Sequence, residues 1–306
     1  MTTTHPTPQP GIFVAPGRHH HHLEIDVHPS ADAAAVVKAV GDSRSAVALL
    51  PDIFFVVGFS APLWEHLAGE DRPIPGLAPF EPVGEAPATQ HDLWLWMHGD
   101  DPDDVFDAAR AALLALLPIG RAAVDQPCLV YRGSRDITGF EDGTANPPLD
   151  EAVDVAVVPA GAGNAAEGGS FVMAQRWVHD LGAFELLSLA DQEGVIGRTK
   201  DGSVQLEGDA MHTDSHVSRV EIRDQSGEEL PVLRRSTAYG TASEYGLYFL
   251  AFSADLQRLH TMLARMFGTS GDGIHDRLVR YTTPVTGSYY FAPALPVLDG
   301  IVPPRA

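Results

Sequence analysis

Residues 53–67 read IFFVVGFSAPLWEHL, and residues 246–263 read GLYFLAFSADLQRLHTML. Each stretch is a continuous apolar run that ends in Phe-Ser and is followed by apolar residues at i, i+3 and i+4 spacing. This order is typical of a buried strand followed by an amphipathic helix, with Ser60 and Ser253 as the expected N-caps. The two halves of the chain are therefore predicted to be copies of one unit.

A second pair of stretches supports this internal repeat. Residues 93–117 and residues 170–189 both read as a strand, a turn and a helix. Strands and helices in this order favour two α+β units, each with an antiparallel sheet that is covered by helices on one face. Glycine and alanine dominate the stretch between the units, which predicts a linker there. The predicted domains are residues 1–147 and 169–306, joined by a linker over residues 148–168.

The composition excludes several classes of protein. The chain has 306 residues, about twice the ~150 residues of one domain, and its formal charge is −21, which would repel nucleic acid. No apolar run of 18 residues is present, which argues against a membrane-spanning protein. A single cysteine, Cys128, cannot form an intrachain disulfide, and the N-terminus lacks the basic and apolar segments of an export signal. We therefore expect a cytoplasmic protein.

The N-terminal residues are unusual in composition. Residues 1–18 are rich in Thr and Pro and are expected to form a flexible arm, followed by four consecutive histidines, His19, His20, His21 and His22. We interpret the histidine run as a solvated strand edge. The alternative is a metal site, which would require a fixed geometry of the rings.

The segment GFEDGTANP, residues 139–147, has two interpretations. It can be a turn in which glycine adopts a positive φ and Asp142 bonds its own backbone. It can also be a ligand-binding loop in which the glycines let the backbone approach a flat ligand while Asp142 points into a pocket. The residue types alone leave both interpretations open.

Known metal and nucleotide motifs are mostly missing from the sequence. His212 and His216 lie four residues apart and could share a helix face and one metal ion, but no glutamate of the HExxH type lies between them. The chain contains no phosphate-binding P-loop, no GxSxG nucleophile turn and no dinucleotide-binding glycine motif after a strand. Phosphate transfer and hydride transfer therefore lose support.

Six segments in order resemble one known family, the dye-decolourising peroxidases, and within it the shorter cytoplasmic branch called B-type. These segments are GFEDGTANP (139–147), GGSFVMAQRWVHDL (168–181), QEGVIGRTK (192–200), SHVSR (215–219), VLRRSTAYG (232–240) and PVTGSYYFAP (284–293). The resemblance implies duplicated ferredoxin-like units of the dimeric α+β barrel type. It also implies one haem b per chain, held between the sheet and the helices of the C-terminal half.

The resemblance further implies roles for individual residues. His216 corresponds to the axial ligand of the haem iron, and Asp276 is the candidate acid that accepts the other ring N–H of this ligand. Asp142 and Arg234 correspond to the carboxylate and the arginine on the opposite face of the haem. Arg198 corresponds to a partner of a haem propionate.

Two further residues, Gly143 and Ser236, are also expected at the cofactor. Ser236 stands where many family members have asparagine. A hydroxyl is shorter than an amide and offers one hydrogen-bond donor instead of two. We therefore expect a looser network of water around the distal side, which would affect the rate with peroxide and not haem binding.

The implied chemistry needs these residue types. An imidazole that bonds a carboxylate through its second nitrogen donates more strongly to ferric haem. A carboxylate can move a proton between the two oxygens of peroxide, and a fixed guanidinium can stabilise the departing oxygen. The resemblance thus implies a haem peroxidase that reduces hydrogen peroxide and oxidises dyes, phenolic compounds or Mn(II) in one-electron steps.

Other functions and partners remain to be weighed against this hypothesis. The alternatives are a haem-handling protein, which carries haem or releases its iron, and a metal-binding stress protein that uses the histidine run. The family implies a homo-oligomer, either a dimer or a hexamer, and small-molecule electron donors as partners. Trp177, Tyr239, Tyr245 and Tyr248 are interpreted as core aromatics and not as electron relays.

Overall fold

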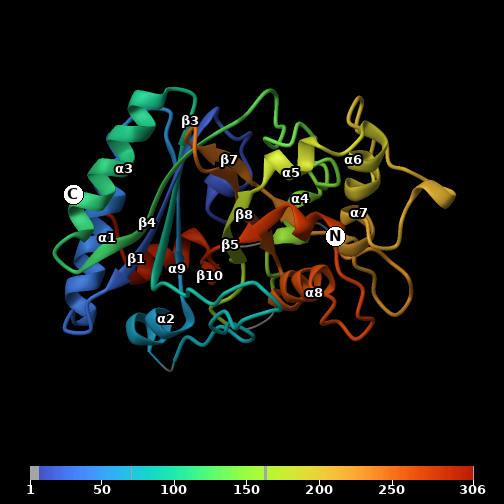
Figure 1. The fold of residues 1–306 in the computed structure, drawn as a ribbon. Helices are drawn as coiled ribbons and strands as arrows, with labels where there is room; N and C mark the ends of the chain where they lie inside the picture. Colours follow the sequence, from blue (N-terminus) through green and yellow to red (C-terminus); the bar gives the residue numbers. More distant parts are fainter. Residues whose placement is uncertain (1–6, 70, 162–163, 306) are drawn as a thin grey trace.

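The computed structural model describes residues 7–69, 71–161 and 164–305 (Figure 1). The elements of the N-terminal half are η1 (Pro10–Ile12), β1 (His19–Val27), α1 (Ala33–Ala48), β2 (Phe54–Phe59), α2 (Ala61–Ala68), β3 (Leu93–Gly99), α3 (Pro102–Leu116) and β4 (Gly120–Leu129). The elements that follow are α4 (Ala152–Ala156), β5 (Ser170–His179), α5 (Leu181–Glu185), α6 (Leu189–Ile196), η2 (Gly208–Ala210), α7 (His216–Val220), β6 (Leu233–Arg234), β7 (Thr237–Gly240), β8 (Tyr245–Ser253), α8 (Leu256–Met266), η3 (Arg277–Arg280), β9 (Thr282–Pro284), β10 (Ser288–Ala292) and α9 (Leu295–Ile301).

The strands form one antiparallel sheet that closes on itself. Their order is β6-β8-β7-β4-β1-β3-β2-β10-β5-β9, and an additional pairing joins β8 to β5. The first half contributes the order β4-β1-β3-β2 and the second half the order β10-β5-β8-β7. Numbered within each unit, both orders are 4-1-3-2, which confirms the predicted α+β class of duplicated ferredoxin-like units. The pairs β4–β7 and β2–β10 join the two units into a barrel.

The topology corrects the correspondence that the sequence suggested between the two halves. β8 and α8 are the third strand and the second main helix of their unit, so their equivalents are β3 and α3. The stretch 53–67 forms β2 and α2 instead, and α2 follows the second strand of its unit. The shared pattern of the two stretches reflects a strand that leads into a helix, which occurs more than once in each half.

The two expected N-caps differ in outcome. Ser60 accepts a hydrogen bond from Leu63 N at 3.3 Å, which confirms it as the N-cap of α2. The expectation for Ser253 is wrong, because β8 continues to this residue and α8 begins only after Asp255. Asp255 Oδ1 accepts from Gln257 N at 2.9 Å and caps α8.

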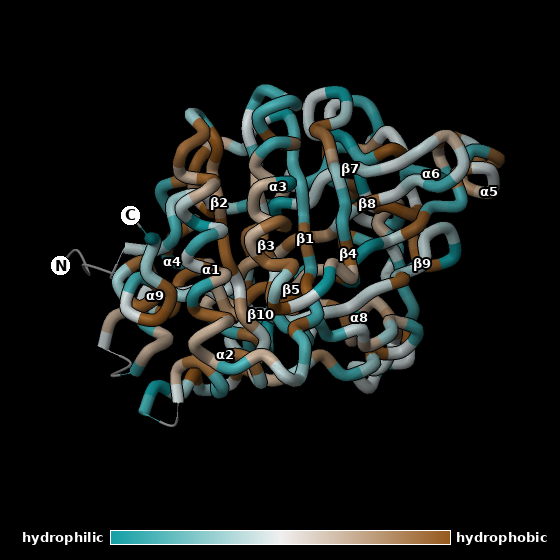
Figure 2. Tube along the Cα trace, turned by 90° about the vertical axis from the view of Figure 1, so that its left-hand side faces the viewer, coloured by the Kyte–Doolittle hydropathy of each residue, from teal (hydrophilic) through white to brown (hydrophobic). Residues whose placement is uncertain are grey.

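The barrel separates two apolar cores. On β3, Leu95 and Met97 face the core under the helices, whereas Trp94 and Trp96 face the interior of the barrel. Figure 1 shows α1 and α3 on one side of the barrel and α5 to α8 on the other. Figure 2 shows that strands such as β2 are apolar, whereas much of β1 and most of the peripheral loops are polar. The outer face of β5 and β8, under α6 to α8, is where the site described below lies.

The histidine run does not lie at a solvated strand edge, so that prediction is wrong. β1 is a central strand that pairs with β3 on one side and with β4 on the other. As a result, His20 and His22 are 1% and 0% exposed. Both neighbouring strands lie far along the chain, since His22 pairs with Trp96 of β3 and with Gln126 of β4, and this placement cannot be inferred from the local sequence.

The N-terminal arm and the predicted linker also contain ordered contacts. The side chain of Gln9 donates to Val57 O at 2.8 Å and accepts from Val57 N at 2.9 Å. The expected flexibility is therefore wrong for this part of the arm, while residues 1–6 lie outside the described residues. Residues 148–168 include α4, whose Ala152 and Ala156 are buried against the barrel core, and residues 162–163 are not described. Among the described residues, no helix has the length and apolar character to cross a membrane.

Candidate active site

A pocket lies between the outer face of β5 and β8 and the helices α6 to α8. One part of it, the apolar pocket, is lined mainly by apolar side chains that include Met173, Trp177, Leu247, Phe249, Met262 and Met266. An adjoining part, the polar pocket, has a volume of about 510 Å³ and is lined by Asp142, Gly143, Arg198, His216 and Arg234 among others. This volume lies within the ~300–1,000 Å³ of small-molecule sites. His216, Asp142 and Arg234 line both parts, so the two parts are continuous.

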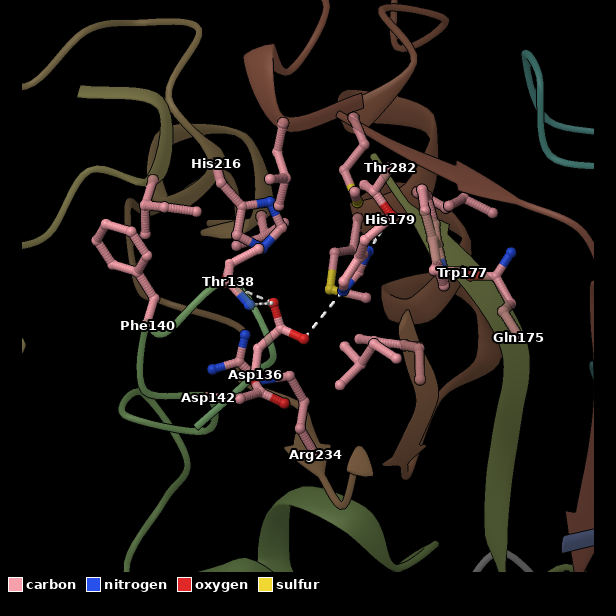
Figure 3. A pocket seen from close by; sticks show the side chains of 18 of the residues that line it. Asp136, Thr138, Phe140, Asp142, Gln175, Trp177, His179, His216, Arg234 and Thr282 are labelled. Atoms are coloured by element: carbon pink, nitrogen blue, oxygen red, sulfur yellow. Dashed lines mark hydrogen bonds and ion pairs between the residues drawn. The ribbon is translucent and has the colours of Figure 1, made fainter. Parts of the chain in front are cut away.

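His216 opens the short helix α7 and is held by a buried carboxylate. The N-cap Ser215 accepts from Ser218 N and starts the helix. His216 Nδ1 lies 2.7 Å from Asp276 Oδ2, and Asp276 is 0% exposed. Because an ionised carboxylate only accepts hydrogen bonds, it favours the proton on Nδ1. Nε2 then keeps its lone pair, and the ring points into the pocket (Figure 3).

Asp276 is itself fixed by the backbone around it. Its second oxygen, Oδ1, accepts from Leu278 N at 2.8 Å and caps the short helix η3. Its amide donates to Met266 O at 2.8 Å, at the end of α8. Asp276 therefore lies behind His216 and does not line the pocket.

The segment 139–147 is both a turn and a wall of the pocket, so its two interpretations are compatible. Gly143 adopts φ +76°, and its amide donates to Asp142 Oδ1 at 2.7 Å. Asn146 joins this loop to β6: its Nδ2 donates to Arg234 O at 2.9 Å, and its Oδ1 accepts from Arg234 N at 2.8 Å. The loop and the strand thus place Asp142 and Arg234 together, on the side of the pocket away from His216 in Figure 3.

Arg198 lies at the polar end of the pocket. Its guanidinium donates to Ser203 O and to Gln205 Oε1, both at 2.9 Å. Partial burial, together with the nearby positive charge of Arg234, lowers the pKa of Arg198. An anionic group bound between the two guanidinium groups would relieve this repulsion.

Two residues from the sequence analysis lie elsewhere. Ser236 lines a third, adjoining pocket together with Asp142, Gly143 and Arg234, and its Oγ accepts from Leu250 N at 3.4 Å. His212 is absent from the lining of these three pockets. α7 begins only at His216, so the two histidines do not share a helix face. The described residues contain no group of three or more His, Cys, Asp or Glu side chains arranged to hold a metal ion.

One part-buried pair in the apolar pocket was not expected from the sequence. His179 Nε2 lies 2.9 Å from Asp136 Oδ1, and His179 Nδ1 lies 2.7 Å from Thr282 Oγ1 (Figure 3). Burial alone would raise the pKa of Asp136, but the hydrogen bond and charge of His179, together with two hydrogen bonds from Thr138, outweigh burial and lower it. Asp136 and His179 lie 43 residues apart. No spacing rule links them, although His179 lies within the quoted segment 168–181 and Asp136 lies just before the quoted segment 139–147.

The residues fit haem, the cofactor that the resemblance implies. Apolar walls on one side and two arginines at the polar end suit a flat ring that carries carboxylates at one edge. A neutral imidazole that is oriented by a buried carboxylate is a strong donor for the iron. The donor set of the pocket is therefore that of a haem site and not of a structural zinc site, which would need four N or S ligands.

Comparisons with known proteins identify the family of the chain. The chain matches the description "Dyp-type peroxidase, N-terminal" over residues 9–119 and "Dyp-type peroxidase, C-terminal" over residues 133–296. A dye-decolorizing peroxidase of Brevibacterium linens is 34% identical over 275 residues, which cover 88% of this chain and 73% of that protein. One of Mycobacterium tuberculosis is 32% identical over 250 residues, which cover 80% of this chain and 74% of that protein.

Solved structures give the same result. A putative Dyp-type peroxidase of Shewanella oneidensis superposes with a TM-score of 0.90 at 28% identity and covers 97% of this chain and 99% of that one. DyPB of Rhodococcus jostii RHA1 superposes with a TM-score of 0.89 at 33% identity, with 96% and 98% of the chains covered. Variants of that protein have been solved in complex with heme and with manganese.

A weaker similarity extends to deferrochelatases. Those of Yersinia pestis and Escherichia coli are 25% identical over 51% of this chain, and the match covers 41% and 42% of their own lengths. The matches to peroxidases are longer and closer, and they include both halves of the chain. The chain therefore belongs to the Dyp-type, or dye-decolourising, peroxidase family and is a haem-dependent peroxidase.

Proposed function

We propose that His216 binds the haem iron and that Asp142 and Arg234 act on hydrogen peroxide from the other side of the pocket. The observation that carries this proposal is that all three side chains line one continuous pocket, in which His216 is backed by the fully buried carboxylate of Asp276. The chemistry that haem supplies when bound is the two-electron reduction of peroxide, followed by one-electron oxidation of donors.

Each residue has a distinct part in this proposal. Asp276 holds the proton of His216 Nδ1, so that Nε2 is available to the iron and is more electron-donating. Asp142 takes a proton from one oxygen of peroxide and delivers it to the other, and Arg234 stabilises negative charge on the oxygen that departs. Arg198 pairs with a propionate, and Gly143 lets the loop approach the haem ring. Ser236 holds the water molecules on the peroxide side of the haem less tightly than asparagine would.

The division of labour between Asp142 and Arg234 is tested by stopped-flow absorbance after mixing with peroxide. Arg234→Leu is expected to slow the reaction by roughly 10²-fold or more, the cost of losing one preorganised donor. Asp142→Ala is expected to cost a comparable factor if its carboxylate is the proton shuttle, since water substitutes only in part. A wild-type rate in Arg234→Leu would eliminate this residue as the main catalyst.

The electron donors, assembly and location belong to the same proposal. We propose dyes, phenolic compounds and Mn(II) as donors, by analogy with the family. We also propose a cytoplasmic homo-oligomer, a dimer or a hexamer, on the family resemblance. Size-exclusion chromatography with light scattering measures the assembly, and a monomeric mass would refute that part.

A further inference from the structure

The interior of the barrel holds a set of polar and aromatic side chains that the proposed peroxide chemistry does not use. We call it the barrel-interior cluster, and its members are His22, Glu24, Trp94, Trp96, Tyr248 and Tyr290. All six side chains are fully buried, with 0% of their surface exposed. A carboxylate and an imidazole in such a place are unusual, because ionisable groups are rarely buried completely.

Glu24 is the centre of the hydrogen bonds in this cluster. Tyr248 Oη donates to Glu24 Oε1 at 3.0 Å, and Tyr290 Oη donates to Glu24 Oε2 at 2.6 Å. Each carboxylate oxygen therefore accepts from one phenol, as an ionised carboxylate does. Burial raises the pKa of Glu24. A carboxylate with a raised pKa is a better proton acceptor than one in water.

Tyr248 links this cluster to the candidate active site. It lies on β8 between Leu247 and Phe249, and both of these neighbours line the apolar pocket. Since side chains alternate across a strand, Tyr248 points to the opposite face, into the barrel. Only the backbone of β8 therefore lies between the side chain of Tyr248 and the neighbouring side chains of Leu247 and Phe249 that line the pocket. Electrons can tunnel over such a separation without any movement of the protein.

The rings around Tyr248 are uncharged. His22 stacks on Tyr248 with ring centroids 3.8 Å apart and planes inclined by 11°. Burial lowers the pKa of His22 well below its ordinary value, so the imidazole is neutral. A neutral ring does not oppose the loss of an electron from its neighbour, whereas an imidazolium would.

From this geometry we propose that Tyr248 is an internal electron donor to the cofactor pocket and that Glu24 takes its proton. The O–H bond of Tyr248 breaks, its proton moves to Glu24 Oε1, and its electron crosses β8 to the pocket. The electron consumes one of the two oxidising equivalents that each peroxide delivers, and a neutral tyrosyl radical stays beside protonated Glu24. This inference rests on the proposed function, because peroxide at the haem is the oxidant. It also replaces the interpretation of Tyr248 as a core aromatic only.

The test is electron paramagnetic resonance of the holoenzyme, frozen after mixing with one equivalent of hydrogen peroxide and no donor. Wild-type protein is expected to give a radical signal that narrows when the protein is made with ring-deuterated tyrosine. Tyr248→Phe is expected to lose this signal. Tyr290→Phe is the matched control, because it removes the other phenol on Glu24 from β10, whose residues do not line the apolar pocket, and it should keep the signal.

A second variant keeps the test decisive if Tyr248→Phe does not bind haem. Glu24→Gln retains Tyr248 but removes the proton acceptor, and it is expected to lose the radical as well. A radical signal of unchanged amplitude in Tyr248→Phe would overturn the inference. A wild-type signal whose width does not change with ring-deuterated tyrosine would overturn it as well. So would the absence of a radical in wild-type protein that binds haem and turns over peroxide. Failure of the wild type to bind haem would instead defeat the proposed function.

Discussion

At the scale of the residue, the contact between His216 and Asp276 decides what the pocket can do. The 2.7 Å hydrogen bond fixes the proton on Nδ1 and directs the free Nε2 into a space with apolar walls. Without Asp276, the imidazole could rotate or change tautomer, and it would be a weaker donor. A carboxylate sixty positions further along the chain thus sets the chemistry of the histidine.

Glu24 provides a prediction about stability and pH. Burial raises the pKa of Glu24 above its ordinary value of 4.5. At a pH between the pKa of Glu24 in the unfolded chain and its raised pKa in the folded protein, the folded state keeps a proton that the unfolded state has lost. The contribution of Glu24 to stability is therefore complete below about pH 4.5 and is lost as the pH rises through the raised pKa. Glu24→Gln does not titrate. The free energy of unfolding of the wild type, relative to this variant, should therefore fall with rising pH.

Urea unfolding of both proteins at a series of pH values from 4 upward measures this difference. Tyr290→Phe serves as a control, because it alters one hydrogen bond to Glu24 but leaves the titrating carboxyl in place. A difference between wild type and Glu24→Gln that stays constant, or that grows in favour of the wild type as pH rises, would show that burial does not raise the pKa of Glu24.

At the scale of the element, the loop 139–147 and the strand β6 act as one part. Asn146 makes two hydrogen bonds to the backbone of Arg234. Asn146→Ala removes both and is expected to lower the free energy of unfolding by about 1–3 kcal/mol, at ~0.5–1.5 kcal/mol for each bond. It should also slow the reaction with peroxide, because Asp142 and Arg234 lose their fixed separation.

Asn146→Asp separates the two bonds. It keeps the acceptor for Arg234 N but loses the donor to Arg234 O, so its stability and its rate should lie between those of wild type and Asn146→Ala. Chemical denaturation and stopped-flow absorbance measure the two quantities. Wild-type stability together with a wild-type rate in Asn146→Ala would mean that the loop is positioned by other contacts.

The elements also show what the sequence can and cannot predict. The apolar run at 54–59 and its capping serine are local signals, and both are found where they were expected. The place of β1 in the middle of the barrel depends on pairing with β3 and β4, and a polar run of histidines conceals it. The equivalence of β8 with β3 likewise depends on strand order, which similar local patterns cannot show.

The same distinction applies to the site. His216, Asp142, Arg234, Arg198 and Gly143 were found through short segments that resemble a family, and they line one pocket. The pairing of Asp136 with His179 and that of Glu24 with two tyrosines join residues far apart in the chain. Contacts of this kind arise from barrel closure and packing, and they leave no spacing in the sequence.

At the scale of the whole molecule, the formal charge of −21 predicts how donors approach. Donors too large to enter the pocket give up electrons at the surface, where the negative potential repels sulfonated anionic dyes and attracts cationic donors and Mn²⁺. Salt reduces the screening length to about 8 Å at 0.15 M. Added salt should therefore speed the oxidation of an anionic dye and slow that of a cationic donor.

The measurement compares one anionic and one cationic donor across ionic strength at fixed pH, with peroxide in excess so that its reaction is not limiting. Opposite signs of the salt effect are expected. Salt effects of the same sign for both donors would show that a local patch, and not the net charge, governs access to the enzyme.

The absorption spectrum of the His216→Ala protein, purified with haem supplied, shows most directly whether His216 holds the haem. His212→Ala is the control, because His212 lies four residues away and outside the pocket lining. Circular dichroism checks that both variants fold. We expect that His216→Ala loses haem or holds it with a spectrum that lacks histidine ligation, while His212→Ala retains the wild-type spectrum. An intact Soret band with histidine ligation in His216→Ala would contradict it.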